Sequence, residues 1–309
     1  MDGSAAVHAE QAKRWSRISF GVSALVLVIK LFAWELTGSA VLMADAAESS
    51  LDLLTATALL LAVSFSRRPA DANHQYGHGK VEYFAALFQA VLILAAALGV
   101  GLEAATRFTA ASAIPDLGWG LGLSTAATVF NAALALGLIR AGRETKSPAL
   151  EADGRHNLAD VVTTLGGWIG LGLAWTTGWW VLDPLFATAV AVHIAWIGVG
   201  IFRGAIDGLM DAAFPDEELE QIHEHLFRAV RREVVPVQYH DLKTRRASHQ
   251  SFIEITLKVP GTMTVEAAHD ICDRIEAELE VLVHGVDVTI HVEPAQDRER
   301  EGDGIFEEE

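Results

Sequence analysis

Long runs of apolar residues alternate with short polar stretches over the first two thirds of the chain. About 20 predominantly apolar helical residues are enough to cross the ~30 Å hydrocarbon core of a bilayer. The pattern therefore predicts six transmembrane helices, several of them long enough to tilt. They span residues 17–37, 40–66, 81–107, 117–140, 150–176 and 180–203.

The pattern changes after residue 206, where charged residues become dense. Periodicities over residues 216–230, 237–248, 250–260, 264–279 and 286–294 predict the order helix, strand, strand, helix, strand. We expect a small two-layer α+β domain. The chain then divides into an N-terminal cytosolic segment (1–16), a six-helix transmembrane domain (17–206), a cytosolic domain (207–294) and an acidic disordered tail (295–309).

The formal net charge of −17 argues against a nucleic-acid partner, because binding to phosphates needs clustered Lys and Arg. The single cysteine, Cys272, excludes an intrachain disulfide and a metal site built from several thiolates. Basic residues concentrate in the N-terminal segment and in the connections at 67–80 and 140–146. The positive-inside rule then places both termini in the cytosol, with the helices in the bilayer of the inner (plasma) membrane.

Two sets of ionisable residues interrupt the second and fifth apolar segments. Within each set the spacing is i, i+3 and i+7, which puts the three side chains on one face of a helix. The sets are Asp45, Glu48 and Asp52 in the second segment, and Asp153, His156 and Asp160 in the fifth. Such groups are costly to desolvate at membrane depth unless they are paired, protonated or bound to a cation.

A divalent cation held between these two helices would offset that cost. Four nitrogen and oxygen donors, which match a tetrahedral Zn²⁺ site, belong to Glu48, Asp52, His156 and Asp160. Protons compete for the same lone pairs, so this site would bind either a metal ion or H⁺. Asp45 and Asp153 lie one turn away and would act as ligands, as partners that orient the ligands, or as proton relays. The other interpretation is that both sets are polar contacts between helices, or that the second segment is not embedded in the membrane.

The connection between the second and third helices contains three further metal-binding side chains, Asp71, His74 and His78. Gly77 and Gly79 suit a tight, exposed turn there. The connection is therefore either a second metal site or a solvated polar loop.

Four residues of the C-terminal domain come from three predicted elements and could converge on a metal ion. They are His240, His269, His291 and Glu293. Since histidines are also common on protein surfaces, four unconnected surface side chains are the alternative interpretation.

Together these motifs resemble those of the cation diffusion facilitators, a family of zinc and manganese efflux transporters. The resemblance covers about residues 13–294 and rests on "LMADAAESSLD", "PADANHQYGHGK", "ADGRHNLAD" and "HDLKTR", which occur in this order. It implies six membrane helices, a ferredoxin-like cytosolic domain, a homodimer and a secondary transporter rather than an enzyme.

The resemblance also implies roles for individual residues. The transport site of the family, shared between the second and fifth helices, corresponds to Glu48, Asp52, His156 and Asp160. The loop site of the family corresponds to Asp71, His74 and His78. Its cytosolic-domain site corresponds to His240, His269, His291 and Glu293. A charge interlock near the dimer seam would pair Lys80 with Asp211.

Two positions depart from the family pattern. Glu48 stands where the family usually has His or Asp, and its extra oxygen character favours Mn²⁺, Fe²⁺, Co²⁺ or Cd²⁺ beside Zn²⁺. Thr256 stands where relatives with two ions in the cytosolic domain can have His. Because Thr is a poor Zn²⁺ ligand, we expect fewer or weaker ions there.

The sequence therefore favours a proton-coupled antiporter that exports Zn²⁺, or one of those other divalent ions, from the cytosol by alternating access, with H⁺ as counter-ion. Zn²⁺ is also the expected regulatory ion. A membrane-anchored metal sensor that binds without transporting is the alternative. An intramembrane metalloprotease is not supported, since the sequence has no H-E-x-x-H motif.

Overall fold

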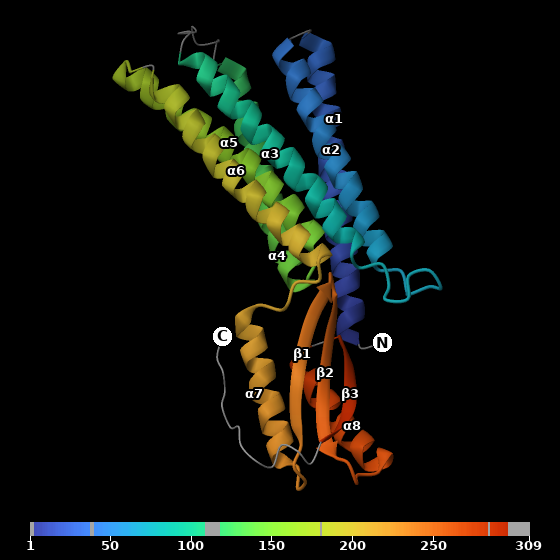
Figure 1. The fold of residues 1–309 in the computed structure, drawn as a ribbon. Helices are drawn as coiled ribbons and strands as arrows, with labels where there is room; N and C mark the ends of the chain where they lie inside the picture. The colour runs from blue at the N-terminus through green and yellow to red at the C-terminus, as the bar shows by residue number, and fades with distance from the viewer. Residues whose placement is uncertain (1–2, 38–39, 109–117, 180, 284, 296–309) are drawn as a thin grey trace. The chain divides into compact units, whose positions relative to one another are not determined.

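The computed structural model describes residues 3–37, 40–108, 118–179, 181–283 and 285–295. The chain divides into two compact units, Met1–Met210 and Asp211–Glu309. In the described ranges, the first unit is built from long helices and the second from three strands and two helices (Figure 1). The predicted tail lies outside the described residues, apart from Ala295.

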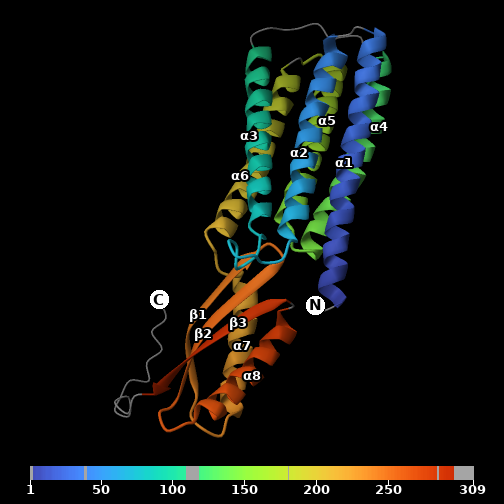
Figure 2. The same cartoon turned by 90° about the vertical axis from the view of Figure 1, so that its right-hand side faces the viewer.

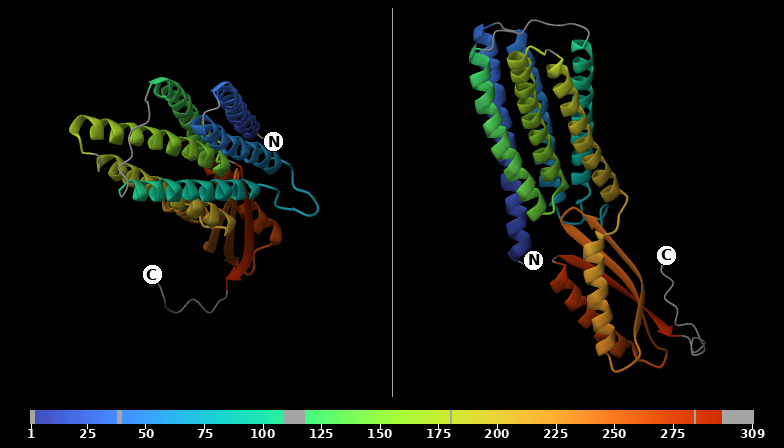
Figure 3. Two further views of the ribbon diagram at one scale, coloured as in Figure 1. Left: turned by 90° about the horizontal axis from the view of Figure 1, so that it is seen from above. Right: turned by 90° about the vertical axis from the view of Figure 1, so that its left-hand side faces the viewer.

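Six helices of 27 to 35 residues make up the described part of the first unit. They are α1 (Gly3–Thr37), α2 (Ala40–Ser66), α3 (Val81–Arg107), α4 (Gly118–Glu144), α5 (Pro148–Thr177) and α6 (Leu182–Leu209). Helix α1 is longer than the apolar pattern predicts, because residues 3–16 continue it. The closest pairs are α1 with α2, α3 with α6, and α4 with α5 (Figure 3).

Four helices of the described part are long and apolar enough to cross a membrane, by length and composition. Their apolar stretches are Val7–Phe32, Ser49–Ser66, Val81–Thr106 and Pro184–Leu209. Large apolar side chains remain exposed on these helices, among them Phe32 (65%), Leu61 (64%) and Trp196 (74%). Water-soluble proteins rarely expose large apolar patches, so this surface suits lipid.

Glycines allow α4 and α5 to pack backbone against backbone. A Cβ on Gly142 would lie 2.6 Å from the backbone nitrogen of Glu151. A Cβ on Gly154 would lie 2.8 Å from the backbone nitrogen of Ile139 and 2.9 Å from the carbonyl oxygen of Ala135. Small residues permit such close approach between membrane helices. The contact restrains the rotation of α5, which carries half of the predicted membrane site.

The second unit contains α7 (Asp216–Arg232), β1 (Gln238–Ala247), β2 (Gln250–Pro260), α8 (Val265–Leu282) and β3 (Val286–Ala295). This order confirms the predicted helix, strand, strand, helix, strand. The sheet order is β1-β2-β3 (Figure 2), with β2 antiparallel to β1 and parallel to β3. Helix α8 makes the crossover that a parallel pair requires.

Both helices of this unit pack on one face of the sheet. Ile253, Ile255 and Leu257 of β2 belong to the same buried cluster as residues from both helices: Ile222, Leu226, Ala268, Ile271, Ile275 and Leu279. Because successive strand residues point to opposite faces, Thr256 faces away from the helices. The cross-strand register pairs Thr256 with His240 on β1 and with His291 on β3, so these three residues form a row on the other face.

Gly154→Ala should destabilise the helical unit by about 1–3 kcal/mol, because the new methyl group meets backbone atoms that cannot rotate away. Gly200→Ala is the control, since a Cβ there meets nothing within 4 Å. That variant should be neutral or more stable by roughly 0.5–1 kcal/mol, the usual helix preference for Ala over Gly. Thermal unfolding of the purified full-length proteins in detergent measures both changes. Equal melting temperatures for the two variants would contradict the close α4–α5 packing.

Candidate metal sites

Asp52 of α2 and the pair His156 and Asp160 of α5 come together within the first unit. One donor atom from each residue lies within 4.8 Å of the other two, and all three side chains are half-buried. His156 Nε2 lies 3.5 Å from Asp52 Oδ1. We call these residues the membrane triad. The structure therefore brings together three of the four ligands that the sequence predicts.

The spacing within the membrane triad suits one tetrahedral ion. Nitrogen and oxygen ligands lie about 2.0–2.2 Å from Zn²⁺, which places neighbouring donors roughly 3.3–3.6 Å apart. The 3.5 Å between His156 Nε2 and Asp52 Oδ1 falls within this range. His156 and Asp160 are one helical turn apart on α5, so both can reach the same point between the helices.

The two other acidic residues of the second segment cannot be placed in the same way. The backbones of Asp45 and Glu48 belong to α2, but their side chains lie outside the described part of the chain. Glu48 as fourth ligand and Asp45 as a supporting residue or relay therefore stay predictions.

Asp153 has a different environment from the membrane triad. Its side chain is buried, and its two carboxylate oxygens accept hydrogen bonds from Ser19 Oγ of α1 (2.6 Å) and Gln89 Nε2 of α3 (3.0 Å). The group of three donors in α2 and α5 does not include it. Asp153 thus connects α5 to two other helices, which fits a supporting role better than a ligand role.

Sequence analysis did not single out Ser19 or Gln89 as functional residues. Each is a polar residue within an apolar helix and is fully buried in the structure. For Gln89, its isolation among apolar neighbours was the available signal, whereas Ser19 lies near other polar residues and gave none. Only the packing of α1, α3 and α5 shows that both side chains donate hydrogen bonds to Asp153.

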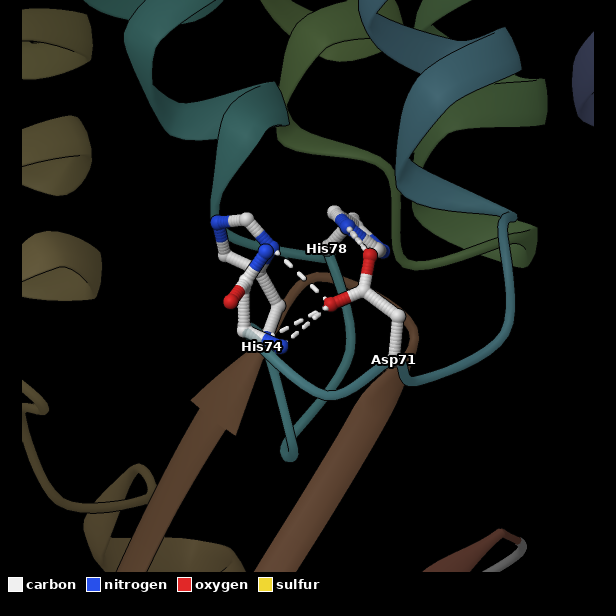
Figure 4. A network of polar contacts seen from close by, with 4 residues as sticks. Asp71, His74 and His78 are labelled. Atoms are coloured by element: carbon white, nitrogen blue, oxygen red, sulfur yellow. Dashed lines mark hydrogen bonds and ion pairs between the residues drawn. The ribbon is translucent and has the colours of Figure 1, made fainter.

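The loop between α2 and α3 gathers Asp71, His74 and His78, which we call the loop triad (Figure 4). Asp71 Oδ1 lies 3.2 Å from His74 Nδ1, and Asp71 Oδ2 lies 3.3 Å from His78 Nε2. Asp71 and His74 are exposed, whereas His78 is buried with its ring edge-on to Phe65. One ion could therefore contact all three side chains and still reach solvent.

Local hydrogen bonds preform the loop triad. The backbone N–H groups of Asn73 and His74 donate to Asp71 Oδ1 (2.9 and 2.7 Å) and fold the turn around it. The His74 backbone N–H holds the pKa of Asp71 below its ordinary value, so the carboxylate stays charged and available at lower pH. His78 Nδ1 is buried without a hydrogen-bond partner among the described residues, and buried polar atoms normally have one.

Three of the four predicted ligands in the second unit lie close together. His240 Nε2 lies 3.7 Å from Glu293 Oε2, and His291 Nε2 lies 3.6 Å from Glu293 Oε1. His240 Nε2 is buried without a hydrogen-bond partner within the described ranges. Thr256 lies between the two histidines in the sheet register. The carboxylate of Glu293 thus faces two imidazoles on the face of the sheet opposite the helices.

The fourth predicted ligand of this unit lies apart from the others. His269 is on α8, which packs on the other face of the sheet, and its Nε2 is 3.7 Å from Asp273 Oδ1 on the same helix. Within one chain, His269 therefore lies on the opposite side of the sheet from His240 and His291.

The residues of the predicted interlock have partners inside their own units. Lys80 Nζ donates to the backbone oxygen of Leu209 (3.3 Å) in the first unit. In the second, Asp211 Oδ1 lies 3.5 Å from Arg245 Nη1. The pairing of Lys80 with Asp211 stays a prediction.

Comparison with known families matches both units. Residues 16–210 match the cation efflux transmembrane domain, and residues 214–295 match the cytoplasmic domain of cation efflux proteins.

Relatives match over nearly the whole chain. An uncharacterized transporter of Synechocystis sp. is 37% identical over 289 residues, which are 94% of this chain and 92% of the relative. The cation-efflux pump FieF of Escherichia coli is 33% identical over 281 residues, which are 91% of this chain and 92% of the pump.

Solved structures of single domains match the C-terminal part. The metal-bound C-terminal domain of the CzcD transporter from Thermotoga maritima is 32% identical, with 26% of this chain and 94% of that one covered and a TM-score of 0.23. A structure of CzrB, described as a candidate zinc transporter, is 44% identical, with 27% and 100% covered and a TM-score of 0.25.

His78→Ala should lower the number of Zn²⁺ ions bound per chain by about one, because the loop triad loses its buried ligand. His225→Ala is the control, since His225 Nδ1 already contacts the backbone oxygen of Gln221 (2.8 Å) on its own helix. Equilibrium dialysis of the purified full-length proteins, followed by metal analysis, gives both numbers. The same zinc content in both variants would exclude the loop triad as a zinc site.

Proposed function

The chain belongs to the cation diffusion facilitator family, also called the cation efflux family, and we propose that it exports Zn²⁺ from the cytosol in exchange for protons. Membership rests on the two matched family domains and on relatives such as FieF, which align with 91% of the chain. The chain is therefore a multi-pass membrane transporter for cations with a cytoplasmic C-terminal domain, and not an enzyme. The choice of ion and the proton coupling are our proposal.

The membrane triad is the observation that carries this proposal. Asp52 comes from α2 and His156 and Asp160 from α5, so an ion bound there lies between two helices of the transmembrane domain. Ionisable residues inside a membrane domain commonly mark the path of an ion, because their burial is otherwise costly. Glu48, one turn before Asp52, is the proposed fourth ligand.

Competition between Zn²⁺ and protons for the same lone pairs would couple the metal flux to the proton flux. An imidazole or carboxylate that binds a divalent ion must first lose its proton, so metal binding releases protons. An ion loaded from the cytosol would leave on the other side when protons occupy His156 and the carboxylates. Transport then requires alternation between states open to each side, with the metal-loaded and protonated forms favouring different states.

Zn²⁺ is the preferred substrate because the triad offers one imidazole nitrogen and carboxylate oxygens in tetrahedral spacing. CzrB, a relative by its C-terminal domain, is described as a candidate zinc transporter. Glu48 would add a further oxygen donor, and oxygen-rich sites also suit Mn²⁺, Fe²⁺, Co²⁺ or Cd²⁺. These ions are the alternative substrates.

The loop triad and the group formed by His240, His291 and Glu293 would hold resident Zn²⁺ ions with a regulatory role. Support comes from His78 Nδ1 and His240 Nε2, which are buried without hydrogen bonds among the described residues, and from the metal-bound domain of the relative CzcD. We propose a homodimer in which Lys80 pairs with Asp211 and in which metal bound to the cytoplasmic domains neutralises acidic surfaces. The transporter would reside in the inner (plasma) membrane with both termini in the cytosol.

A membrane-anchored metal sensor is the alternative function. It would also use the loop and cytoplasmic sites. It would not need ionisable ligands on two facing transmembrane helices, so the membrane triad favours transport. Metal binding by purified protein without any flux across liposomes would favour the sensor.

Asp160→Ala should reduce Zn²⁺ flux more than about 100-fold, since loss of even an outer partner of a metal ligand typically costs 10–100-fold. Glu103→Ala is the control, because it removes an exposed carboxylate from α3. Flux is measured in proteoliposomes with an imposed pH gradient. Light scattering should give a dimer mass for wild type and variants alike. Wild-type flux in Asp160→Ala would refute the site, and a monomer mass for wild type would refute the homodimer.

Glu48→His should shift preference toward Zn²⁺ and away from Mn²⁺, because imidazole replaces an oxygen donor that Mn²⁺ favours. Glu48→Asp keeps an oxygen donor and serves as the control. Transport rates for a panel of divalent ions in the same proteoliposomes give the preference. An unchanged ratio of Zn²⁺ to Mn²⁺ rates in Glu48→His would show that selectivity lies elsewhere.

A further inference from the structure

A buried carboxylate outside the metal sites connects three membrane helices. Glu82 lies in the first turn of α3 and is fully buried. Ser66, the last residue of α2, donates through Oγ to Glu82 Oε1 (2.5 Å). Ser147, directly before α5, donates through Oγ to Glu82 Oε2. These contacts, which we call the Glu82 bridge, join the end of α2 to the start of α5.

The Glu82 bridge lies at the cytoplasmic ends of the helices. Lys80, two residues before Glu82, donates through Nζ to the backbone oxygen of Leu209, the last residue of α6 (3.3 Å). The start of α3 is therefore level with the end of α6. Since α6 leads into the cytoplasmic domain, this level is the cytoplasmic one.

A positive charge and a helix terminus lie next to the two hydrogen bonds of Glu82. Arg67, next to Ser66, exerts its positive charge on Glu82. Its Nε and Nη2 atoms are buried without hydrogen-bond partners among the described residues. The amino terminus of α3 also favours a negative charge. Loss of one partner of a buried hydrogen bond is costly, so each serine contributes to holding the two helix ends together.

Apolar packing fills the region between the Glu82 bridge and the membrane triad. Ser66 is 14 residues beyond Asp52 on α2, or about 21 Å of helix. Residues of α2 and α5 in this region belong to one buried apolar cluster: Leu59, Ala62, Val63, Ala149 and Leu150. A hydrated ion cannot cross a close-packed apolar core without opening it. This apolar packing therefore lies between the membrane triad and the cytoplasmic ends of α2 and α5.

We propose that Glu82 is a positioning residue whose bridge to Ser66 and Ser147 holds the cytoplasmic ends of α2 and α5 together, and whose release opens the route from the cytoplasm to the membrane triad. The bridge would be intact while the ion leaves on the other side and broken while a new ion enters. This role rests on the proposed function, since such a gate is needed only if the ion crosses the membrane.

Alkylation of a buried cysteine tests the bridge without requiring transport. Val63→Cys places a thiol in the apolar cluster of the full-length chain, with Cys272→Ala removing the native thiol. A water-soluble maleimide is applied to the cytoplasmic face of inside-out vesicles. Ser66→Ala should raise the alkylation rate about tenfold, because it removes one hydrogen bond that only the closed state makes.

Ser64→Ala is the matched control, since Ser64 is exposed on the same helix two residues earlier. It should leave the rate unchanged. Equal alkylation rates in Ser66→Ala and Ser64→Ala would overturn the bridge as a gate.

Transport kinetics give a second test, because a merely structural role of Glu82 would leave the KM for cytoplasmic Zn²⁺ unchanged. In Ser66→Ala and Glu82→Gln, the KM for cytoplasmic Zn²⁺ and the kcat should both fall several-fold, because the state open to the cytoplasm gains population and closure slows. Simple loss of folded protein would lower the maximal rate with KM unchanged, and that result would overturn the proposal. If wild type moves no ion at all, the proposed function fails, and the alkylation rates alone decide for or against the bridge.

Discussion

Every charge inside the transmembrane domain needs a partner from the protein itself or from a bound ion, because lipid supplies neither hydrogen bonds nor counter-charge. The described helices meet this requirement in two ways. Asp153 and Glu82 receive side-chain hydrogen bonds from residues outside their own helices. Asp52, His156 and Asp160 instead face one another at distances that suit a cation. The first arrangement stabilises helix packing, whereas the second offers a candidate site for a cation.

The two arrangements occur on the same helices, and this links the candidate metal site to the packing. Helix α5 carries Asp153, which contacts α1 and α3, and one turn later it carries His156. Helix α2 carries Asp52 and ends at Ser66, which contacts Glu82. Any movement that separates α2 from α5 must therefore break some of these hydrogen bonds. The close α4–α5 contact at Gly154 leaves α4 and α5 to move together.

Periodicity and spacing predicted a large share of this architecture. The apolar runs indicated the long helices, and the alternation after residue 206 indicated the α+β order that the second unit has. The i, i+4 spacing of His156 and Asp160 indicated a shared helix face, which the membrane triad uses. The sequence indicated that His240 and His291 could converge. Their exact positions on either side of Thr256 came only from the structure, because the register between strands depends on a bulge after His240 and on the α8 crossover.

The sequence by itself determined which side chains can bind a metal ion and on which helix faces they lie, because local spacing fixes both. Only the tertiary structure decided which carboxylates remain available to the proposed ion. Ser19 and Asp153 are 134 residues apart, and Ser147 and Glu82 are 65 apart, so no local pattern connects them. Asp153 belongs to the same stripe as His156 in sequence, yet packing gives it two hydrogen-bond donors. A carboxylate whose charge is satisfied by fixed donors has less to gain from a cation than one that faces other ligands.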